Sequence, residues 1–455
     1  IGHSPIASLI DPVAGTRTAI AESLSNIVWA PIKDGMKGIS LSANWMWACK
    51  NPGEDARLYA AVEACSHFAI ELGINIPTGK DSLSMKQKYP NDEVIAPGTV
   101  IISAAGNCSN ITKVVEPVLQ RNGGNIYYIN LSQDSFKLGG SSFAQVLNKI
   151  GNDVPTIQNS EFFKKAFNVL QDLIKDRKIK AGHDIGSGGL ITTLLEMCFA
   201  DDKLGALIDL TSLGEKDTVK ALFNENIGVV FQADAEVEAT FAQNNIEIFK
   251  IGSAIDGDAF TVINGEDSLT FSIATLRDTW FKTSFLLDSK QSKNGMAQER
   301  FDNYKNQKLQ FSFPSHFDGK LPVIDASKPR PKAAIIREKG SNSEREMANA
   351  MYLAGFDVKD VHMTDLISGR ETLEDIQFIG AVGGFSNSDV LGSAKGWAGA
   401  FKYNEKANTA LKNFFKREDT LSVGICNGCQ LFMELEVINP EHEVHGKMLH
   451  NDSHK

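Results

Sequence analysis

Residues 424–430 (GICNGCQ) carry the strongest chemical signal in the sequence. Cys426 ends an apolar run and precedes an apolar stretch with helical spacing, and Gly424 and Gly428 stand two residues away on either side. This pattern is typical of a nucleophile elbow, in which glycines permit a tight, strained turn that projects the central side chain. The positive end of the helix dipole favours a thiolate there, and N–H groups of the turn can stabilise an oxyanion. A buried structural cysteine, or a redox or metal pair with Cys429, are the alternatives.

A second candidate lies at residues 383–385, after the apolar run 378–382. Gly383 and Gly384, followed by Phe385, let backbone amides face a ligand at the carboxyl end of a predicted strand. We therefore expect an oxyanion or glutamine-binding loop here. An ordinary β-to-α turn is the alternative.

Oxygen-bearing and basic side chains in the first half of the chain could hold an anion and a metal. Glu22 and Asn26 are four residues apart, so both lie on one face of the predicted helix 16–31. Oxygen ligands suit Mg²⁺, which completes its shell with phosphates and water. Lys80 and Ser82 can set a cation and a hydroxyl beside a phosphate. A solvated helix face and a surface ion pair between Lys80 and Asp81 are the alternatives.

The elements around these residues predict three regions. In the first, residues 1–120, we expect helices at 16–31 and 53–73, strands at 38–43 and 99–105, and a short extended segment at 75–77. In the second, 121–300, strands at 126–131, 204–210, 228–232 and 246–252 alternate with helices at 142–150, 161–177, 219–223 and 235–242, and 182–189 reads as a glycine-rich turn.

The remaining residues divide into a linker at 301–331, within a polar stretch that starts at 289, and a third region at 332–455. Strands are expected at 333–337, 357–362, 378–383 and 421–425, with helices at 343–354 and 400–415. This βαβ rhythm indicates a doubly wound parallel sheet, whose ligands sit at the carboxyl ends of the strands. The fold class is therefore α/β throughout.

Composition excludes several classes of protein. The 455 residues are 42% hydrophobic and 22% charged, and 46 basic against 56 acidic residues give a net charge of −10. That balance argues against a nucleic-acid partner, and the longest apolar run falls far short of the about 18 residues of a membrane span. No signal peptide opens the chain, and six cysteines in so long a chain form no disulfide framework, so we expect a cytoplasmic protein.

Several segments together resemble a known family. The segments GICNGCQ (424–430) and GGFS (383–386), with residues 337–342, resemble the class I glutaminase domain of large, single-chain phosphoribosylformylglycinamidine synthases of purine biosynthesis. Segments 21–27, 41–46, 53–55, 79–85 and 183–184 resemble the second half of that family's synthetase core, in the same order. The resemblance covers nearly the whole chain. It implies two-layer α/β domains like aminoimidazole ribonucleotide synthetase, followed by a partial flavodoxin-like glutaminase.

The resemblance implies roles for particular residues. Cys426 matches the nucleophile, and the Mg²⁺ ligands are Glu22, Asn26 and Asp184. ATP or ADP is the implied nucleotide, and its site or that of the substrate is implied to include Asn44, Gly79, Lys80, Ser82 and Ser187. Ser187 is included because the family has a nucleotide-contacting Ser at the position of Gly186, and Ser187 is the neighbouring hydroxyl in this chain. The family's GGFSYGD also reads GGFSNSD here, with Asn387 and Ser388 replacing Tyr and Gly.

The implied reaction converts formylglycinamide ribonucleotide into its amidine with ATP and with ammonia from glutamine. The family's first synthetase half, a further metal-binding Asp and the glutaminase His and Glu would lie outside residues 1–455, so we expect this stretch to be inactive alone. Two other functions stay open. One is a structural module that holds ADP without turnover, and the other is a cysteine hydrolase unrelated to purines.

Overall fold

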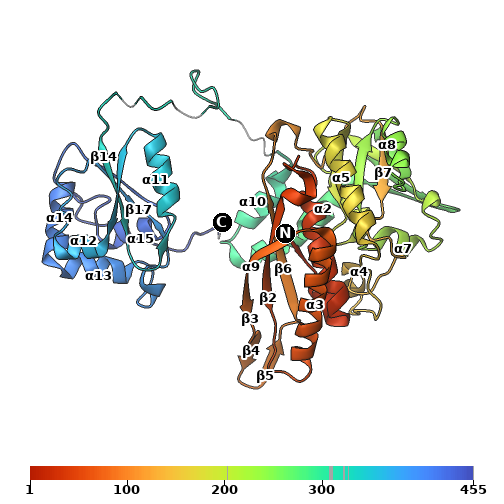
Figure 1. Ribbon diagram of the computed structural model, residues 1–455, viewed down its shortest axis with the longest axis horizontal. Coiled ribbons are helices and arrows are strands. Elements are labelled where there is room, and N and C mark those ends of the chain that lie inside the picture. Colours follow the sequence, from red (N-terminus) through yellow and green to blue (C-terminus); the bar gives the residue numbers. More distant parts are fainter. Residues whose placement is uncertain (202, 307–310, 321–322, 326, 454–455) are drawn as a thin grey trace. The chain divides into compact units, whose positions relative to one another are not determined.

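The computed structural model describes residues 1–201, 203–306, 311–320, 323–325 and 327–453. It divides into two compact units, Ile1–Ser284 and Phe285–Lys455 (Figure 1). The predicted boundary at 120/121 falls between the two large sheets of the first unit. We describe each unit by itself.

The first sheet of the first unit has four strands and is covered by two long helices. Its order is β1 (Gly2–His3), β6 (Thr99–Gly106), β2 (Ile39–Met46), β3 (Asn75–Ser82), with β2 antiparallel to β6 and parallel to β3. Helices α2 (Pro12–Ile27) and α3 (Glu54–Leu72) share a buried core with Leu41 and Ala43. Because side chains alternate along a strand, Asn44 points to the opposite face. The expected helices and strands are confirmed, and β3 is longer than expected because it continues to Ser82.

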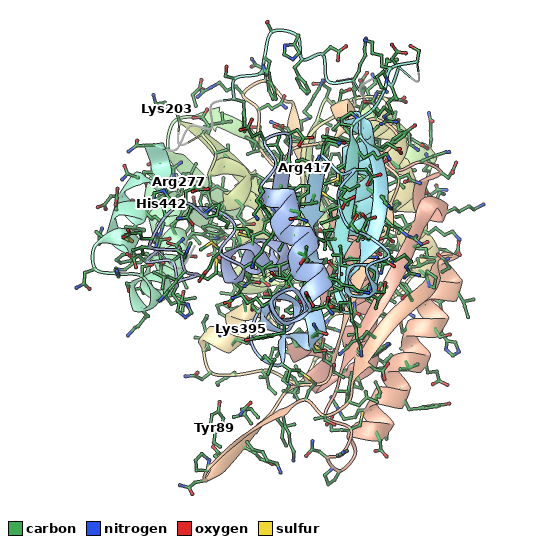
Figure 2. The ribbon with its side chains drawn as sticks, turned by 90° about the vertical axis from the view of Figure 1, so that its left-hand side faces the viewer. Tyr89, Lys203, Arg277, Lys395, Arg417 and His442 are labelled. Carbon is green, nitrogen blue, oxygen red and sulfur yellow. The ribbon has the colours of Figure 1, made fainter. Side chains whose placement is uncertain are left out.

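Three smaller elements of this part were not expected from the sequence. They are α1 (Pro5–Ile10) and the hairpin of β4 (Lys86–Tyr89) and β5 (Asp92–Ile95). Figure 2 shows the hairpin projecting from the sheet with Tyr89 at its end. All residues of both hairpin strands are exposed, so burial gave the sequence no apolar pattern to reveal them.

The second sheet of the first unit has helices on both faces. Its order is β13 (Asp267–Ser272), β12 (Ala259–Asn264), β9 (Leu204–Asp209), β11 (Phe249–Asp256), β7 (Asn125–Ile129), β10 (Val229–Ala233), β8 (Ile179–Asp184). Tyr127 points into one core with α5 (Ser160–Lys175) and α8 (Val237–Gln243). Tyr128 points into the other core, with α6 (Gly189–Cys198) and α7 (Thr218–Phe223). The short helix α4 (Ser142–Val146) lies between β7 and α5 in the sequence.

Two expectations for this sheet were wrong. Residues 182–184, expected in a glycine-rich turn, belong to β8, and Gly182 is there because an added Cβ would stand 2.0 Å from the Trp29 ring. The hairpin β12–β13 was not expected, because its outer strand is largely exposed and has only Leu269 and Phe271 as apolar residues.

The polar stretch from residue 289 is not wholly a linker. Helices α9 (Ile273–Gln291) and α10 (Met296–Asn303) occupy its start, and a short 3₁₀ turn at Tyr304–Asn306 follows. Arg300 pairs with the carboxylate of Asp288, and the ring centroids of Phe285 and Phe301 lie 5.0 Å apart, so an ion pair and an aromatic contact both join α10 to α9. Residues 307–310, 321–322 and 326 of the predicted linker lie outside the described residues.

The second unit contains the expected parallel sheet. Its order is β16 (Asp357–His362), β14 (Lys332–Arg337), β17 (Phe378–Ala381), β19 (Leu421–Gly424), and all pairs are parallel. Figure 1 shows α11 (Glu344–Leu353) on one face, and α12 (Met363–Ser368), α13 (Lys395–Tyr403) and α14 (Glu405–Phe415) on the other. A single helix at 400–415 was wrong, because Asn404 ends α13 and caps α14 by accepting from the Ala407 N–H.

Candidate functional site

Cys426 lies at the carboxyl edge of the parallel sheet, where β19 meets α15 (Asn427–Glu434). Its backbone has φ 55° and ψ −112°, a conformation that non-glycine residues rarely adopt. The side chain is exposed, and the cysteine caps the amino end of the helix. The sequence therefore places a thiol on a strained strand-to-helix turn, as the elbow pattern predicted.

Two glycines make this turn sterically possible. A Cβ on Gly424 would stand 2.6 Å from the Gly428 carbonyl oxygen, and one on Gly428 would stand 2.1 Å from the Ala381 carbonyl oxygen. Both distances are far below van der Waals contact. Gly424 is thus required by the close approach of α15 to β19, and Gly428 by the close approach of α15 to β17.

The predicted glycine loop lies beside the thiol. A Cβ on Gly383 would stand 3.3 Å from Cys426 Cβ and 3.8 Å from Cys426 Sγ. Gly384 pairs with Ser341 in the short ladder of β15 (Ser341–Asn342) and β18 (Gly383–Gly384). The Phe385 N–H donates to the Gly340 carbonyl at 3.0 Å, so this amide is already bound. Of the three loop residues, Gly383 is the one that lies against Cys426, whereas Gly384 lies against the backbone of residues 340–342.

Cys429 lies one turn further along α15 and is half-buried. Its N–H donates to the Cys426 carbonyl at 3.0 Å, and both cysteines are free thiols. The Cys429 side chain therefore extends from the side of α15, whereas that of Cys426 extends from the strained turn before the helix.

The predicted metal ligands come together from α2 and β8. Asn26 Nδ2 donates to Asp184 Oδ2 at 3.5 Å, and Glu22 Oε2 accepts from the His3 N–H at 2.7 Å. Burial raises the pKa of Glu22, and the negative charge of Asp184 raises it further. The two carboxylates are thus close enough to repel one another, and a cation bound between them would reduce this repulsion.

A histidine to which the sequence analysis assigned no role, His183, already compensates one of these carboxylates. His183 Nδ1 lies 3.5 Å from Asp184 Oδ1, and His183 Nε2 lies 3.3 Å from Glu196 Oε2. Burial opposes its charge, but hydrogen bonds to the two carboxylates raise the pKa of His183 to about 10. Burial likewise opposes the charge of Asp184, and the hydrogen bond and charge of His183 outweigh it and lower the pKa. The signal was missed because Glu196 contacts His183 only after β8 and α6 have packed.

The residues present fit Mg²⁺ in part. Two carboxylates and an amide match the oxygen preference of that ion. Among the residues that the structure describes, no group of three or more His, Cys, Asp or Glu side chains is placed to hold a metal. Glu22, Asn26 and Asp184 would therefore hold the ion together with oxygens of a ligand, and the Asn26 amide would have to turn its oxygen toward Asp184.

A second unexpected residue, Glu225, occupies the glycine turn after β8. Its Oε1 accepts from the Gly188 N–H at 2.7 Å and from the Ser142 N–H at 2.8 Å. Ser187 and Glu22 line a pocket of about 60 Å³ with Glu225, which is room for a small hydrated ion. One amide that the turn could offer to phosphate is thus bound to a carboxylate of the protein itself. The contact joins residues far apart in the sequence, so no local pattern announced it.

The remaining predicted residues lie elsewhere on the first sheet. Asn44 pairs in register with Lys80, and Ser82 accepts a hydrogen bond from Lys80 Nζ. Gly79 is required because a Cβ there would stand 2.2 Å from the Ala43 carbonyl oxygen. Within the described part of the chain Lys80 makes no ion pair, so the expected alternative of a pair with Asp81 is absent. Asn44, Lys80 and Ser82 share the sheet face turned away from α2, whereas Glu22 belongs to α2 itself.

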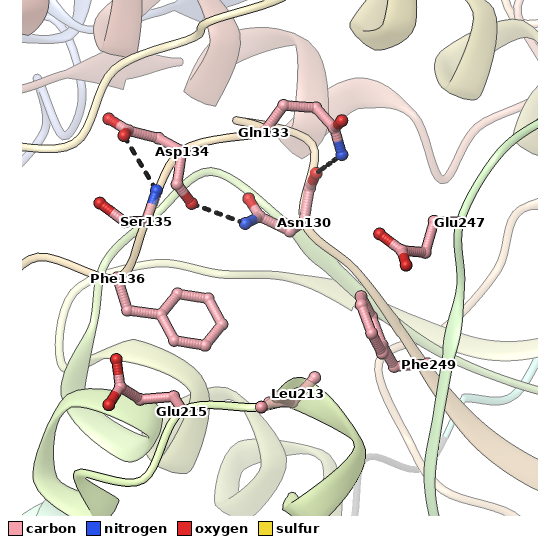
Figure 3. Close-up of a pocket in the computed structure, with 10 residues that line it drawn as sticks. Asn130, Gln133, Asp134, Ser135, Phe136, Leu213, Glu215, Glu247 and Phe249 are labelled. Carbon is pink, nitrogen blue, oxygen red and sulfur yellow. Dashed lines mark hydrogen bonds between the residues drawn. The ribbon is translucent and has the colours of Figure 1, made fainter.

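A larger pocket in the first unit includes none of the predicted residues. It lies between the segments 130–136, 213–215 and 247–249 and has a volume of about 350 Å³. Figure 3 shows that its lining includes the rings of Phe136 and Phe249 and the carboxylates of Glu215 and Glu247. Among the described residues, no helix is long and apolar enough to span a bilayer.

Comparisons with known proteins agree with this geometry. Three family models match: an FGAR-AT PurM_N-like domain at residues 1–107, the C-terminal domain of AIR synthase related proteins at 125–264, and a CobB/CobQ-like glutamine amidotransferase domain at 330–455. The AIR-synthase-like fold followed by a partial glutaminase is thereby confirmed.

Curated relatives match nearly the whole chain. A probable phosphoribosylformylglycinamidine synthase, chloroplastic/mitochondrial, of Arabidopsis thaliana is 40% identical over 100% of this chain and 33% of its own length. The human phosphoribosylformylglycinamidine synthase is 38% identical over 95% of this chain and 33% of its own length. Among solved structures, phosphoribosylformylglycinamidine synthase II from Thermotoga maritima is 13% identical, with a TM-score of 0.45 over 60% of this chain and 43% of that one.

The chain spans about one third of the length of the curated relatives it matches. Its order of domains, its elbow cysteine and its sequence identity agree with one another. The chain is therefore homologous, along its whole length, to one third of phosphoribosylformylglycinamidine synthase, a glutamine-dependent ligase of purine biosynthesis.

Proposed function

We propose that this chain is part of an enzyme that converts formylglycinamide ribonucleotide into formylglycinamidine ribonucleotide, with ATP and with ammonia from glutamine. The observation that carries the proposal is the backbone of Cys426, a non-glycine residue held at φ 55° between two obligatory glycines. Strain of this kind costs of order 1–3 kcal/mol and persists where the surrounding structure enforces it, which is typical of active sites. The homology to known synthases supplies the reaction class.

The glutaminase step follows from the chemistry of the elbow. The Cys426 thiolate attacks the side-chain amide carbon of glutamine, and the carbonyl oxygen becomes an oxyanion. The N–H groups of Gly384 and Asn427 are the donors that we assign to that oxyanion. The amide nitrogen takes up one proton, equivalent to the one that the Cys426 thiol lost on ionisation, and leaves as ammonia when the C–N bond breaks. Water then hydrolyses the γ-glutamyl thioester to glutamate and the free thiol.

We also propose that Glu22, Asn26 and Asp184 bind Mg²⁺ with the phosphates of ATP or ADP, and that Ser187 lies beside them. The contact between Asn26 and Asp184 and the repulsion between the two carboxylates support this assignment. A bound Mg²⁺ would neutralise phosphate charge at this position. Asn44, Lys80 and Ser82 lie on the sheet face turned away from α2, and Gly79 directly precedes Lys80 in β3. We therefore assign them to a separate contact with nucleotide or substrate on the opposite face of the sheet.

The experiment that tests the glutaminase role compares two nitrogen sources. In the natural-length protein that contains this chain, Cys426→Ser should abolish amidine synthesis from glutamine. The same variant should still use free ammonia, because the synthetase needs only the nucleophile. Cys429→Ser is the matched control and should keep most glutamine-dependent activity. Glutamine-dependent synthesis that survives in Cys426→Ser would refute the proposal.

The compartment is also part of the proposal. All six cysteines are free thiols, of which Cys108 and Cys426 are exposed. Exposed thiols persist in a reducing compartment, and we propose the cytoplasm. Localisation of a tagged natural-length protein checks this.

A further inference from the structure

The side chain of Asn427 connects the nucleophile turn to the neighbouring loop. Asn427 is 1% exposed, and it directly follows Cys426. Its Oδ1 accepts from Ser386 Oγ at 2.6 Å and from the Ser386 N–H at 3.4 Å. Its Nδ2 donates to Asp389 Oδ1 at 3.3 Å and to Gln430 Oε1 at 3.2 Å. One buried amide thus uses both its donors and its acceptor.

From this network we propose that Asn427 is a positioning residue, which fixes the loop 383–389 against the elbow and so sets the Gly384 N–H relative to the Cys426 thiol. The inference rests on the proposed glutaminase function. The positioning role can be tested separately from that function, because the Asn427 side chain contacts the loop 383–389 and not the Cys426 thiol.

The loop needs such a connection because its backbone is strained. Asn387, Ser388 and Asp389 have φ values of 52°, 56° and 47°, three successive non-glycine residues in the left-handed region. The cost is about 1–2 kcal/mol for a residue such as Ser388, and it is smaller for Asn and Asp, which adopt this region more readily. On the side away from the elbow, the Asn387 N–H donates to the Lys339 carbonyl at 2.8 Å. Asn427 supplies the hydrogen bonds on the elbow side, through Ser386 before the strained run and Asp389 at its end.

The chemistry of the network favours an amide at this position. An aspartate could accept from Ser386 but has no N–H for Asp389, and its buried carboxylate would then face the half-buried carboxylate of Asp389. An alanine would leave the Ser386 hydroxyl and N–H without this acceptor. Both changes release the loop while leaving the Cys426 backbone and thiol in place.

The test uses the natural-length protein and the variants Asn427→Ala, Asn427→Asp and Ser386→Ala. Misplacement of a catalytic group by about 1 Å can cost on the order of 10²-fold. We therefore expect the glutamine-dependent kcat to fall by about 10- to 100-fold in both Asn427 variants. KM for glutamine should change little, and ammonia-dependent kcat should not change. Asn413→Ala, which removes an exposed asparagine from α14, is the matched control.

Two further measurements separate positioning from a general loss of structure. The rate at which iodoacetamide alkylates Cys426 should stay close to wild type, whereas amide hydrogen exchange at residues 385–389 should accelerate. Ser386→Ala, a smaller change, should lower kcat in the same direction. The double variant Ser386→Ala/Asn427→Ala should be no worse than Asn427→Ala alone, because both remove one network.

The outcomes are distinct. If Cys426→Ser abolishes glutamine use while Asn427→Ala and Ser386→Ala retain wild-type kcat, the positioning role is overturned and the proposed function stands. Equal losses with glutamine and with ammonia would also overturn it, because they would indicate a structural effect on the whole protein. If Cys426→Ser retains glutamine use, the proposed function itself fails.

Discussion

Gly428 lies so close to Ala381 that a Cβ on the glycine would stand 2.1 Å from the alanine carbonyl oxygen. This contact joins the first turn of α15 to the end of β17, the strand that runs into the glycine loop. The backbone thus fixes the start of α15 against the end of β17, and the side chain of Asn427 then connects this turn to the loop that follows β17. Side chains can adjust their rotamers, whereas a backbone contact of this kind allows no substitute for glycine.

Gly428→Ala should destabilise the protein. The added methyl group has no room without moving β17 or α15, and overpacking of this kind costs typically about 1–3 kcal/mol. Urea denaturation measures the change. Gly399→Ala on α13 is the control: its Cβ would meet Tyr403 at an ordinary 3.8 Å, so it should be neutral or stabilising by up to about 1 kcal/mol. Equal effects of the two changes would contradict the steric argument.

Ser388→Gly should stabilise the loop. Ser388 has φ 56° and ψ 21°, and glycine adopts that conformation without the steric penalty of a side chain. We expect a gain of about 1 kcal/mol in the free energy of unfolding. Ser388→Ala keeps the penalty, so it should show no gain. A rise in stability with alanine as well would mean that the serine hydroxyl, and not the backbone, is responsible.

Glu22→Gln should weaken the binding of Mg²⁺ with ADP. The substitution keeps an acceptor for the His3 N–H and removes only the charge. A loss of about tenfold, equal to about 1.4 kcal/mol, is expected in calorimetry with both ligands present. Glu63→Gln, at an exposed position of α3, serves as control and should bind normally. Unchanged affinity in the Glu22 variant would remove it from the metal site.

The metal-free protein should become less stable at high pH, because His183 loses its proton there. Its pKa is raised from 6.5 to about 10, so folding favours the protonated form. The resulting stability is complete below pH about 6.5 and is lost as pH rises towards about 10, at about 1.4 kcal/mol for each pH unit. Urea denaturation in EDTA across that range measures the slope. His183→Asn should flatten it, and an identical slope in the variant would exclude His183 as its source.

The elbow could be predicted from sequence because its residue pattern is local, although the contact of Gly428 with Ala381 is not. Gly424, Cys426 and Gly428 act within one turn, and the apolar residues of β19 precede them directly. The pairing of Glu22 with Asn26 is equally local, because it depends only on helical spacing. The spacing of residues along one element can be read directly from the sequence.

Contacts between distant segments could not be predicted in this way. Glu225 reaches the Gly188 N–H and the Ser142 N–H, and Asn427 reaches Ser386. Each depends on how separate elements pack, and a lone Glu or Asn carries no sign of it. The break between α13 and α14 was missed for another reason: the apolar residues of both helices continue with similar spacing, and only the cap at Asn404 separates them.

The backbone of Cys426 has a consequence for engineering. Because φ there is 55°, glycine would relieve the strain that cysteine must bear. A directed-evolution campaign that selected variants only for thermal resistance would tend to replace this cysteine, and its winners would lose the nucleophile. Stability and function thus favour different residues at position 426, and a screen of this protein has to select for both at once.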